Sequence, residues 1–258
     1  MKSNLAQRQL WTRDKLIKTL ALYCQIPFGK MHSNNKDVVA LSKIIGRTPS
    51  AVALKLVNFA SLDPDLKDRN IRGMSNSSKI DKDIWNEYYG KWDTLAENSI
   101  FEDLLTSAQV NKLKIVPVSQ PSGPTEVIRE TKIRRGQHFF RMAVLAAHKS
   151  KCCITGITSE SLLRASHIVP WAHDQSLRLD PRNGLCLNAL HDAAFDRGLI
   201  TISDKLELKI SRRLKTEVPT SVYQEMFENR AGMVIELPER FRPSFEMLKF
   251  HQTKIFCA

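Results

Sequence analysis

The sequence predicts an α+β protein in which an all-helical front part is followed by a smaller unit of two strands and a helix. Residues 11–59 carry apolar residues at helical spacing, and residues 152–200 follow the order strand, strand, helix. Residues 116–126, rich in proline and serine, separate the two parts. We therefore expect a helical domain at residues 1–115, a linker at 116–126 and a second domain at 127–258, whose core is 152–200.

The front part has the pattern of a helix-turn-helix. Apolar residues recur at helical spacing over residues 37–45, and Gly46 interrupts them. Thr48 and Pro49 then supply an N-cap and a first-turn proline for a second helix that runs to Phe59. Helix, glycine turn and capped helix in this order are typical of DNA-binding helix-turn-helix modules.

The second of these helices offers a candidate DNA-reading surface. Residues 11–26 supply a third apolar-striped helix against which it can pack. Its other face then turns Arg47, Ser50 and Lys55 towards solvent or a DNA groove. Three-helix cores are also common in domains that never touch DNA, so the DNA-reading role is a hypothesis.

The core of the second part is predicted from its turn and helix signals. Residues 153–157 are typical of a strand and turn, and residues 165–171 of a short strand that Pro170 stops. Residues 188–195 are typical of a helix, and Gly198 ends it. Two short strands and one helix therefore fall within about fifty residues.

Reactive side chains are concentrated in this core, with His167 after a strand, Asn183 in a loop, and Asp192 and Asp196 on the helix. An imidazole, whose ordinary pKa is about 6.5, suits the deprotonation of water near neutral pH. Carboxylates on one helix face can hold a divalent cation against a phosphate. The combination indicates a site that hydrolyses phosphodiester bonds.

The same residues fall in three motifs, SHI-x-PW, NGL-x-L and HD-x-x-FD-x-GLI, which together resemble the HNH nucleases of the ββα-metal group. In particular, they resemble a bacterial branch of restriction endonucleases. The flanking RRGQHFFRMAVLAAH and ELPERFRPSFEMLKFHQTKIF also resemble that branch, so the resemblance covers nearly the whole chain. It implies a C-terminal ββα-metal nuclease domain and endonuclease activity on DNA.

Carried over residue by residue, the resemblance puts His167 at the general base and Asn183 at the asparagine that orients the imidazole. It puts Asp192 and Asp196 at the helical metal-ligand positions, and it implies single-metal hydrolysis that leaves a 3′ hydroxyl. Many members have Asp or His directly before the base, whereas this chain has Ser166. Carboxylates, waters and phosphate oxygens would then complete the coordination, which suits Mg²⁺ or Mn²⁺.

Helix geometry bears on the choice of metal ligands. Asp192 and Asp196 are four residues apart and share a face, whereas His191 shares a face with Phe195. The two aspartates are therefore favoured, with His191 as an alternative ligand. Each residue also has a simpler interpretation: His167 as a histidine in the core, Asn183 as a turn residue, and Asp192 and Asp196 as solvated acids. Only their joint order and spacing favour a nuclease.

The charge favours a polyanionic partner. The formal net charge is +12, and basic residues outnumber acidic ones both before and after residue 125. We expect double-stranded DNA as the partner, with Arg134, Arg135 and Arg141 lining a groove for its backbone. A solvated helix face is an equally good account of these arginines.

The five cysteines include no C-x-x-C pair, so no structural zinc is expected. They fit a reducing compartment. The chain also shows no signal-peptide pattern and no apolar run long enough to span a bilayer, and we expect a cytoplasmic protein with no membrane partner.

We interpret the remaining segments as structural elements rather than parts of the catalytic site. Trp85, Tyr88, Tyr89 and Trp92 fall at helical spacing and are interpreted as packing residues, with a pocket for a flipped base as the alternative. Residues 200–211 are typical of a hairpin. The tail is expected to form a closing helix in which His251 is structural.

Together these features predict a metal-dependent DNA endonuclease of restriction type, active as a homodimer with one site for each strand. A DNA-binding regulator with a degenerate core is the first alternative, because Ser166 replaces the usual ligand. An RNA nuclease is the second. If the protein is an endonuclease, a homing or a nicking role is also compatible with the sequence.

Overall fold

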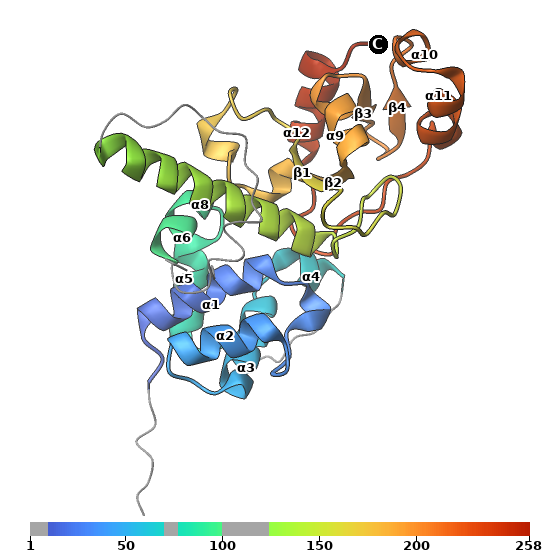
Figure 1. Ribbon diagram of the computed structural model, residues 1–258. Helices are drawn as coiled ribbons and strands as arrows, with labels where there is room; N and C mark the ends of the chain where they lie inside the picture. Colours follow the sequence, from blue (N-terminus) through green and yellow to red (C-terminus); the bar gives the residue numbers. More distant parts are fainter. Residues whose placement is uncertain (1–9, 70–76, 100–123) are drawn as a thin grey trace, which may run out of the picture.

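The fold is organised around one long helix, α8 (Pro124–Ala147). In this computed structural model, which describes residues 10–69, 77–99 and 124–258, α8 runs between the N-terminal helices and the C-terminal elements (Figure 1). It contacts α1 (Arg13–Gln25) and α6 (Trp92–Asn98) on one side. On the other side it contacts the strands β1 (Leu163–His167) and β2 (Gly184–Asn188). The two predicted domains therefore pack against the same helix.

The predicted linker lies largely outside the described residues. Residues 116–123 are not described, and residues 124–126 form the first turn of α8. The domain boundaries therefore stay a prediction. Buried apolar residues from both parts of the chain belong to one continuous core.

Six α-helices form the described N-terminal part, and most begin at a residue whose side chain caps the first turn. They are α1, α2 (Lys36–Ile44), α3 (Pro49–Ala60), α4 (Pro64–Asp68), α5 (Lys79–Tyr88) and α6. Thr48 caps α3 by accepting a hydrogen bond from Ala51 N–H, and Gly46 turns the chain between α2 and α3 at φ 62°. Helices thus form in the three predicted segments, while their DNA-reading role stays a prediction.

An aromatic cluster fills the centre of this helical part. Trp85 stacks on Tyr89 with ring centroids 4.7 Å apart, and Trp92 packs edge-on to Phe241 at 5.3 Å. Trp85, Tyr88 and Trp92 are buried. The interpretation of these residues as packing residues is confirmed.

The C-terminal segment is tied into the helical part by a buried arginine. The guanidinium of Arg240 donates to the carbonyl oxygens of Tyr23 and Ile26 at 2.8 and 2.7 Å and lies over the Tyr23 ring. The Tyr23 hydroxyl in turn donates to Asp63 at 2.6 Å. A buried charge needs such partners, because its desolvation is costly.

Lys55 does not face solvent, and the prediction that it does is wrong. Its Nζ lies 2.9 Å from each carboxylate oxygen of Asp81, and the two side chains are 9% and 0% exposed. The reason is helical spacing: Lys55 is three residues after Val52 and four before Phe59, both of which are buried. Lys55 is therefore part of the core and is removed from the candidate DNA contacts.

Replacing Asp81 by alanine is expected to lower the free energy of unfolding by about 3–5 kcal/mol, because Lys55 would stay buried without a counter-charge. Denaturant unfolding would measure this. Asp83→Ala, an exposed acid on the same helix α5, is the matched control. If the pair is as described, Lys55→Met combined with Asp81→Ala recovers most of the loss; a loss no larger than that of Asp83→Ala would contradict it.

The C-terminal part contains the predicted ββα order; β1 overlaps the strand predicted at residues 165–171, whereas β2 lies where no strand was predicted. β1 (Leu163–His167) pairs antiparallel with β2 (Gly184–Asn188), and α9 (Ala189–Asp196) follows directly. Residues 153–157, predicted as a strand and turn, contain the turn but no strand, and a hydrogen bond from Gly156 N–H to the Cys152 carbonyl closes that turn. Every residue of β2 is buried, so its sequence shows no alternation that would reveal a strand.

The segments after α9 complete this part. β3 (Ile200–Ile202) and β4 (Leu208–Ile210) form the predicted hairpin. The short helices α10 (Leu214–Glu217) and α11 (Thr220–Met226) follow, and α12 (Phe245–Phe250) continues into a π-helical turn at His251–Ile255. His251 is buried between Thr201 Oγ1 and the Phe195 carbonyl, which confirms its structural reading.

Buried histidines make the fold sensitive to acid. Burial lowers the pKa of His148, at the end of α8, to about 4. Because the unfolded chain takes up this proton near pH 6.5, its contribution to stability is complete above that pH and is lost as the pH falls towards 4. We expect His148→Gln to remove about 3 kcal/mol of this pH dependence. Unfolding curves at several pH values would test it, with exposed His32→Gln as the control; an unchanged slope for His148→Gln would contradict it.

None of the helices in the described part of the chain combines the length and the apolar character that a membrane crossing requires.

Candidate active site

The start of α9 is fixed by a buried hydrogen-bond network around Asn188. The Asn188 side chain caps the helix by accepting from Leu190 N–H and His191 N–H, and it donates to His191 Nδ1 at 2.8 Å. His191 Nε2 then donates to the Met226 carbonyl at 2.9 Å. The network sets the direction in which the first turn of α9 presents its side chains.

His191 is not available as a metal ligand, and the alternative that assigned it to the metal is wrong. One of its ring nitrogens accepts from Asn188 and the other donates to Met226, and the side chain is fully buried. Burial lowers its pKa, so the ring stays neutral. A metal bond would require breaking one of these hydrogen bonds in the core.

Asp192 and Asp196 lie one turn apart on α9 and influence each other. Partial burial and the charge of Asp192 raise the pKa of Asp196 to about 6. Partial burial also raises the pKa of Asp192, against the opposing effects of Ser166, Arg164 and Arg141. Two carboxylates that repel each other at short range form a place where a cation is favoured.

Two arginines flank Asp192. Arg141 of α8 donates to the carbonyl oxygens of Leu163 and Glu160 at 3.0 and 3.1 Å, and Arg164 of β1 donates to the Leu163 carbonyl at 2.9 Å. The charges of both arginines lower the pKa of Asp192. The Arg164 side of β1 therefore lies near Asp192 and carries positive charge next to it.

Ser166 lies on the same side of β1. It is 2% exposed, and its hydroxyl is near enough to Asp192 to lower the pKa of that carboxyl. It makes no hydrogen bond within 3.5 Å in the described part of the chain. A buried hydroxyl in this state can accept or donate one further bond, for which a water is the simplest partner.

His167, the last residue of β1, is held by its neighbours on the other side of the strand. Its ring stacks on Phe140 of α8 with centroids 3.9 Å apart and packs edge-on to Trp171 at 5.5 Å. Nε2 lies 2.9 Å from the Arg178 carbonyl and must donate to it, because a carbonyl only accepts. In the neutral ring, Nδ1 therefore carries the lone pair.

The state of His167 suits a general base. Burial lowers its pKa, so the neutral ring predominates near neutral pH. Among the described residues Nδ1 has no hydrogen-bond partner, and it is not one of the buried unpaired atoms. It is therefore open to take a proton from a water molecule.

Asn183 holds the loop that supports His167. Its side chain accepts from Val169 N–H at 2.7 Å and donates to the carbonyls of Val169 and Leu177, both at 3.1 Å. Arg178, whose carbonyl holds the His167 ring, comes directly after Leu177. Asn183 thus contacts the loop and not the ring itself, and its influence on the imidazole would pass through that loop.

The structure brings the two aspartates together but leaves His167 in a separate group of contacts. Neither aspartate is hydrogen-bonded to His167 within the described ranges. In the same part of the chain, no three His, Cys, Asp or Glu side chains converge where a metal ion could be held. Any metal would have to take its remaining ligands from water or from a phosphate.

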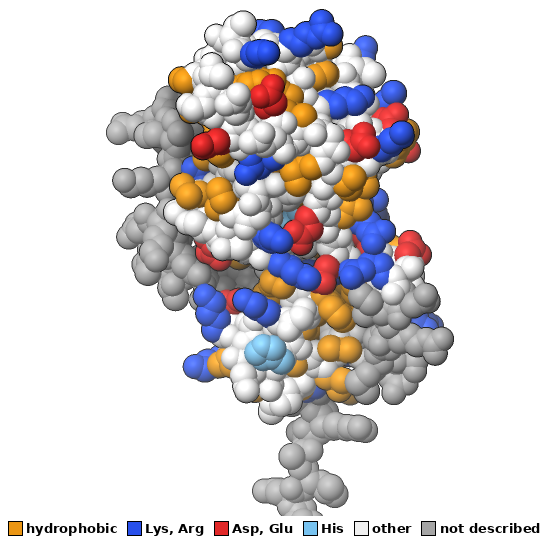
Figure 2. Space-filling view, turned by 90° about the vertical axis from the view of Figure 1, so that its right-hand side faces the viewer, with side chains coloured by type: hydrophobic (Ala, Val, Ile, Leu, Met, Phe, Trp, Pro, Cys, Tyr) orange, Lys and Arg blue, Asp and Glu red, His pale blue; other side chains and the backbone are white. Residues whose placement is uncertain are grey.

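The candidate DNA-binding residues are scattered. Arg47 is half-buried with its guanidinium 4.6 Å from the Trp11 ring centre, and Ser50 is exposed. Arg135 and Arg141 on α8 are half-buried, and the side chain of Arg134 is outside the described residues. On the face shown in Figure 2, Lys and Arg side chains are spread over both halves and mixed with acidic ones.

Two features of the site were missed from the sequence. Arg178 acts through its backbone carbonyl, which no side-chain pattern reveals. Phe140 contacts His167 from a helix distant in sequence. Arg164 lies two residues before Ser166 and so shares its side of β1, which sequence spacing alone can indicate.

Residues 152–203 match a family model described as HNH endonuclease. This segment contains β1, β2, α9 and β3, and with them His167, Asn183 and both aspartates. No curated protein matches the chain. The segment is thus similar to an HNH endonuclease domain, which implies nuclease activity and a nucleic-acid substrate. The likeness to a restriction branch outside this segment stays a prediction.

Proposed function

We propose that the protein is a metal-dependent endonuclease that hydrolyses phosphodiester bonds in double-stranded DNA, in a restriction-type role. The observation that carries the proposal is the state of His167, a neutral ring in which Nε2 is bonded to the Arg178 carbonyl and Nδ1 has no partner among the described residues. His167 ends the strand whose other side lies near Asp192. It lies inside the segment similar to an HNH endonuclease.

His167 acts as the general base in this proposal. Nδ1 takes a proton from a water molecule while Nε2–H stays bonded to the Arg178 carbonyl, which keeps the ring in one tautomer and one orientation. The hydroxide attacks phosphorus, and the bond to the 3′ oxygen breaks. Asn183 is a positioning residue, because it holds the loop that carries the Arg178 carbonyl.

Asp192 and Asp196 would hold a single divalent cation. Their donor set fits in chemistry, since carboxylate oxygens suit Mg²⁺ or Mn²⁺, and such ions keep several waters when the protein supplies few ligands. The raised pKa of both carboxyls marks a site that a cation would relieve. When bound, the cation supplies positive charge to the phosphate and to the departing oxygen.

Arg141 and Arg164 attract the substrate phosphate in this account. Both are anchored to backbone carbonyls on the Asp192 side of β1, so their charge is fixed in place. The net charge of +12 favours approach of a polyanion. For target reading we propose α3 with Arg47 and Ser50, helped by the arginines of α8. A homodimer would cut both strands.

A plasmid assay tests the proposal. Supercoiled DNA incubated with the protein and Mg²⁺ or Mn²⁺ should be converted to open-circular and linear forms, and EDTA should stop the reaction. A structured RNA substrate is included in parallel. If only RNA is cleaved, the substrate is RNA and not DNA. If neither is cleaved, the nuclease proposal is wrong.

A second candidate is a DNA-binding regulator with a degenerate core. Ser166, whose hydroxyl has no hydrogen-bond partner in the described residues, favours it, because a serine is a poor metal ligand at the position next to the base. The same assay separates the two: a regulator retards duplex DNA in a gel but leaves it intact with every metal.

A further inference from the structure

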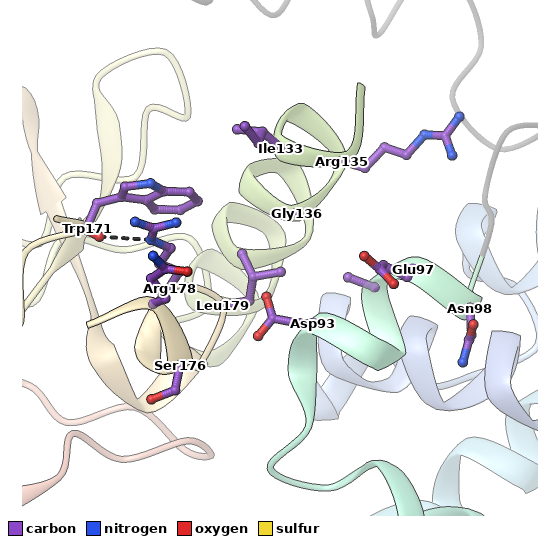
Figure 3. A pocket seen from close by; sticks show the side chains of 12 residues that line it. Asp93, Glu97, Asn98, Ile133, Arg135, Gly136, Trp171, Ser176, Arg178 and Leu179 are labelled. Carbon is purple, nitrogen blue, oxygen red and sulfur yellow. Dashed lines mark hydrogen bonds between the residues drawn. The ribbon is translucent and has the colours of Figure 1, made fainter. Parts of the chain in front are cut away.

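A hollow lies beside the candidate active site, between α6, α8 and the loop that follows β1 (Figure 3). Its volume is about 630 Å³, within the range of small-molecule sites. Residues from both halves of the chain line it, among them Asp93, Glu97, Ile133, Trp171, Arg178 and Leu179.

The walls of this hollow differ in chemistry. Leu179 and Gly136 form an apolar floor, and they are so close that a Cβ on Gly136 would lie 2.9 Å from Leu179 Cδ1. On one side the Trp171 ring lies over the Arg178 guanidinium, with 5.0 Å between them (Figure 3). Asp93 stands on the opposite side, at the start of α6.

The acidic and basic walls affect each other. Partial burial and the charge of Glu97 raise the pKa of Asp93, while the charge of Arg178 opposes this rise. A flat ligand with apolar faces, a hydrogen-bond-donating edge and an anionic group would complement all three walls. A carboxylate only accepts hydrogen bonds, so the edge towards Asp93 must carry donors.

The hollow is joined to His167 by two direct contacts. Trp171, which lines it, packs against the His167 ring at 5.5 Å. Arg178, which also lines it, holds His167 Nε2 through its carbonyl and donates from Nε to the Trp171 carbonyl at 2.9 Å. Two residues that line the hollow therefore also contact the imidazole.

Resting on the nuclease function proposed above, we infer that this hollow binds one nucleotide of the substrate strand beside the cleaved phosphate. A base with an exocyclic amino group, as in cytosine or adenine, donates to Asp93, and the nucleotide's phosphate lies against Arg178. The flat base covers the apolar floor. This assigns Asp93 a role in selecting the base next to the cut.

Binding of deoxynucleoside 5′-monophosphates to the full chain, measured by isothermal titration calorimetry, tests the inference. We expect dCMP and dAMP to bind roughly tenfold more tightly than dTMP, the preference expected for a carboxylate that accepts from an amino group. Asp93→Asn should abolish this preference. Asp83→Asn, which removes an exposed charge on α5 away from the hollow, should keep it.

A second variant at the hollow tests whether a change in binding could result from misfolding of the first variant. Ile133 is 42% exposed at the hollow, so Ile133→Glu should fold normally and weaken all three nucleotides by repelling their phosphates. Thermal unfolding would confirm that each variant is folded. Equal binding of the three nucleotides, or binding unaffected by both Asp93→Asn and Ile133→Glu, would overturn the inference.

Two further binding experiments distinguish the proposed nucleotide site from the proposed nuclease function. A single-stranded oligonucleotide should displace dCMP; failure to displace it would mean that the hollow takes a free nucleotide and not one of a strand. His167→Ala should bind dCMP as the wild type does. If the protein binds dCMP selectively but cleaves no nucleic acid, the nucleotide site is supported and the nuclease function is contradicted. If it cleaves DNA but binds no nucleotide, the nuclease function is supported and the nucleotide site is contradicted.

Discussion

Replacing His167 by alanine is expected to lower the rate of DNA cleavage by about 10²–10⁴-fold while leaving the affinity for duplex DNA within a few-fold of the wild type. The loss follows because the neutral His167 ring, whose Nδ1 has no hydrogen-bond partner among the described residues, supplies the proposed base. Single-turnover cleavage of a plasmid and gel retardation of the same DNA would measure the two effects separately.

The pH dependence gives a second readout for the same residue. Burial lowers the pKa of His167, so the wild-type rate should be constant near neutral pH and fall only below about 6.5, where the base becomes protonated. His173→Ala, an exposed histidine in the following loop, is the matched control and should cleave normally. A His167→Ala enzyme that cleaves within a few-fold of the wild type would remove His167 from the mechanism.

Replacing Asp192 by asparagine should reduce cleavage by about 10³-fold, because the cation loses a charged ligand and the neighbouring Asp196 cannot hold it alone. The substitution keeps the shape of the side chain, so folding should be unaffected. Mn²⁺ binding, followed by electron paramagnetic resonance, should weaken in parallel with activity.

Asp204→Asn is the control for this experiment, since Asp204 is an exposed acid whose contact is a 3.7 Å ion pair with Lys249. It should bind Mn²⁺ and cleave DNA as the wild type does. Unchanged metal binding in both Asp192→Asn and Asp196→Asn would place the metal elsewhere in the chain.

Local signals predicted much of the fold. Thr48 and Pro49 mark the start of α3, and Gly198 follows the end of α9 at φ 68°, where a side chain would collide with the Ile255 backbone. Such capping and turn signals depend on a few adjacent residues and can be read from sequence. The period-two pattern likewise placed the β3–β4 hairpin.

The errors arose where distant contacts decide the outcome. Lys55 is buried because Asp81, on another helix, supplies its counter-charge. His191 looked like a metal ligand, but Met226, far along the chain, takes its second nitrogen. The β2 strand was missed because both of its faces are buried. A single sequence does not state which partners meet in space, so these assignments required the structure.

The candidate site likewise combines features that local sequence predicts with features that depend on distant contacts. The order and spacing of His167, Asn183, Asp192 and Asp196 were read from the sequence, and their segment matches the HNH endonuclease family model. The tautomer of His167, by contrast, depends on a backbone carbonyl, and the charge around Asp192 depends on Arg141 from α8. The sequence thus supplied the candidate residues, and the structure supplied their surroundings.

In the proposed mechanism, His167 and the two aspartates act on the same phosphate from opposite sides. Crystals of the His167→Ala protein with duplex DNA and Mn²⁺, measured by anomalous scattering, would show where the metal and the phosphate lie. We expect one Mn²⁺ peak bound by Asp192 and Asp196 and by a phosphate oxygen, with the vacated imidazole position facing that phosphorus atom. A metal bound away from α9, or a phosphate out of reach of position 167, would contradict the account.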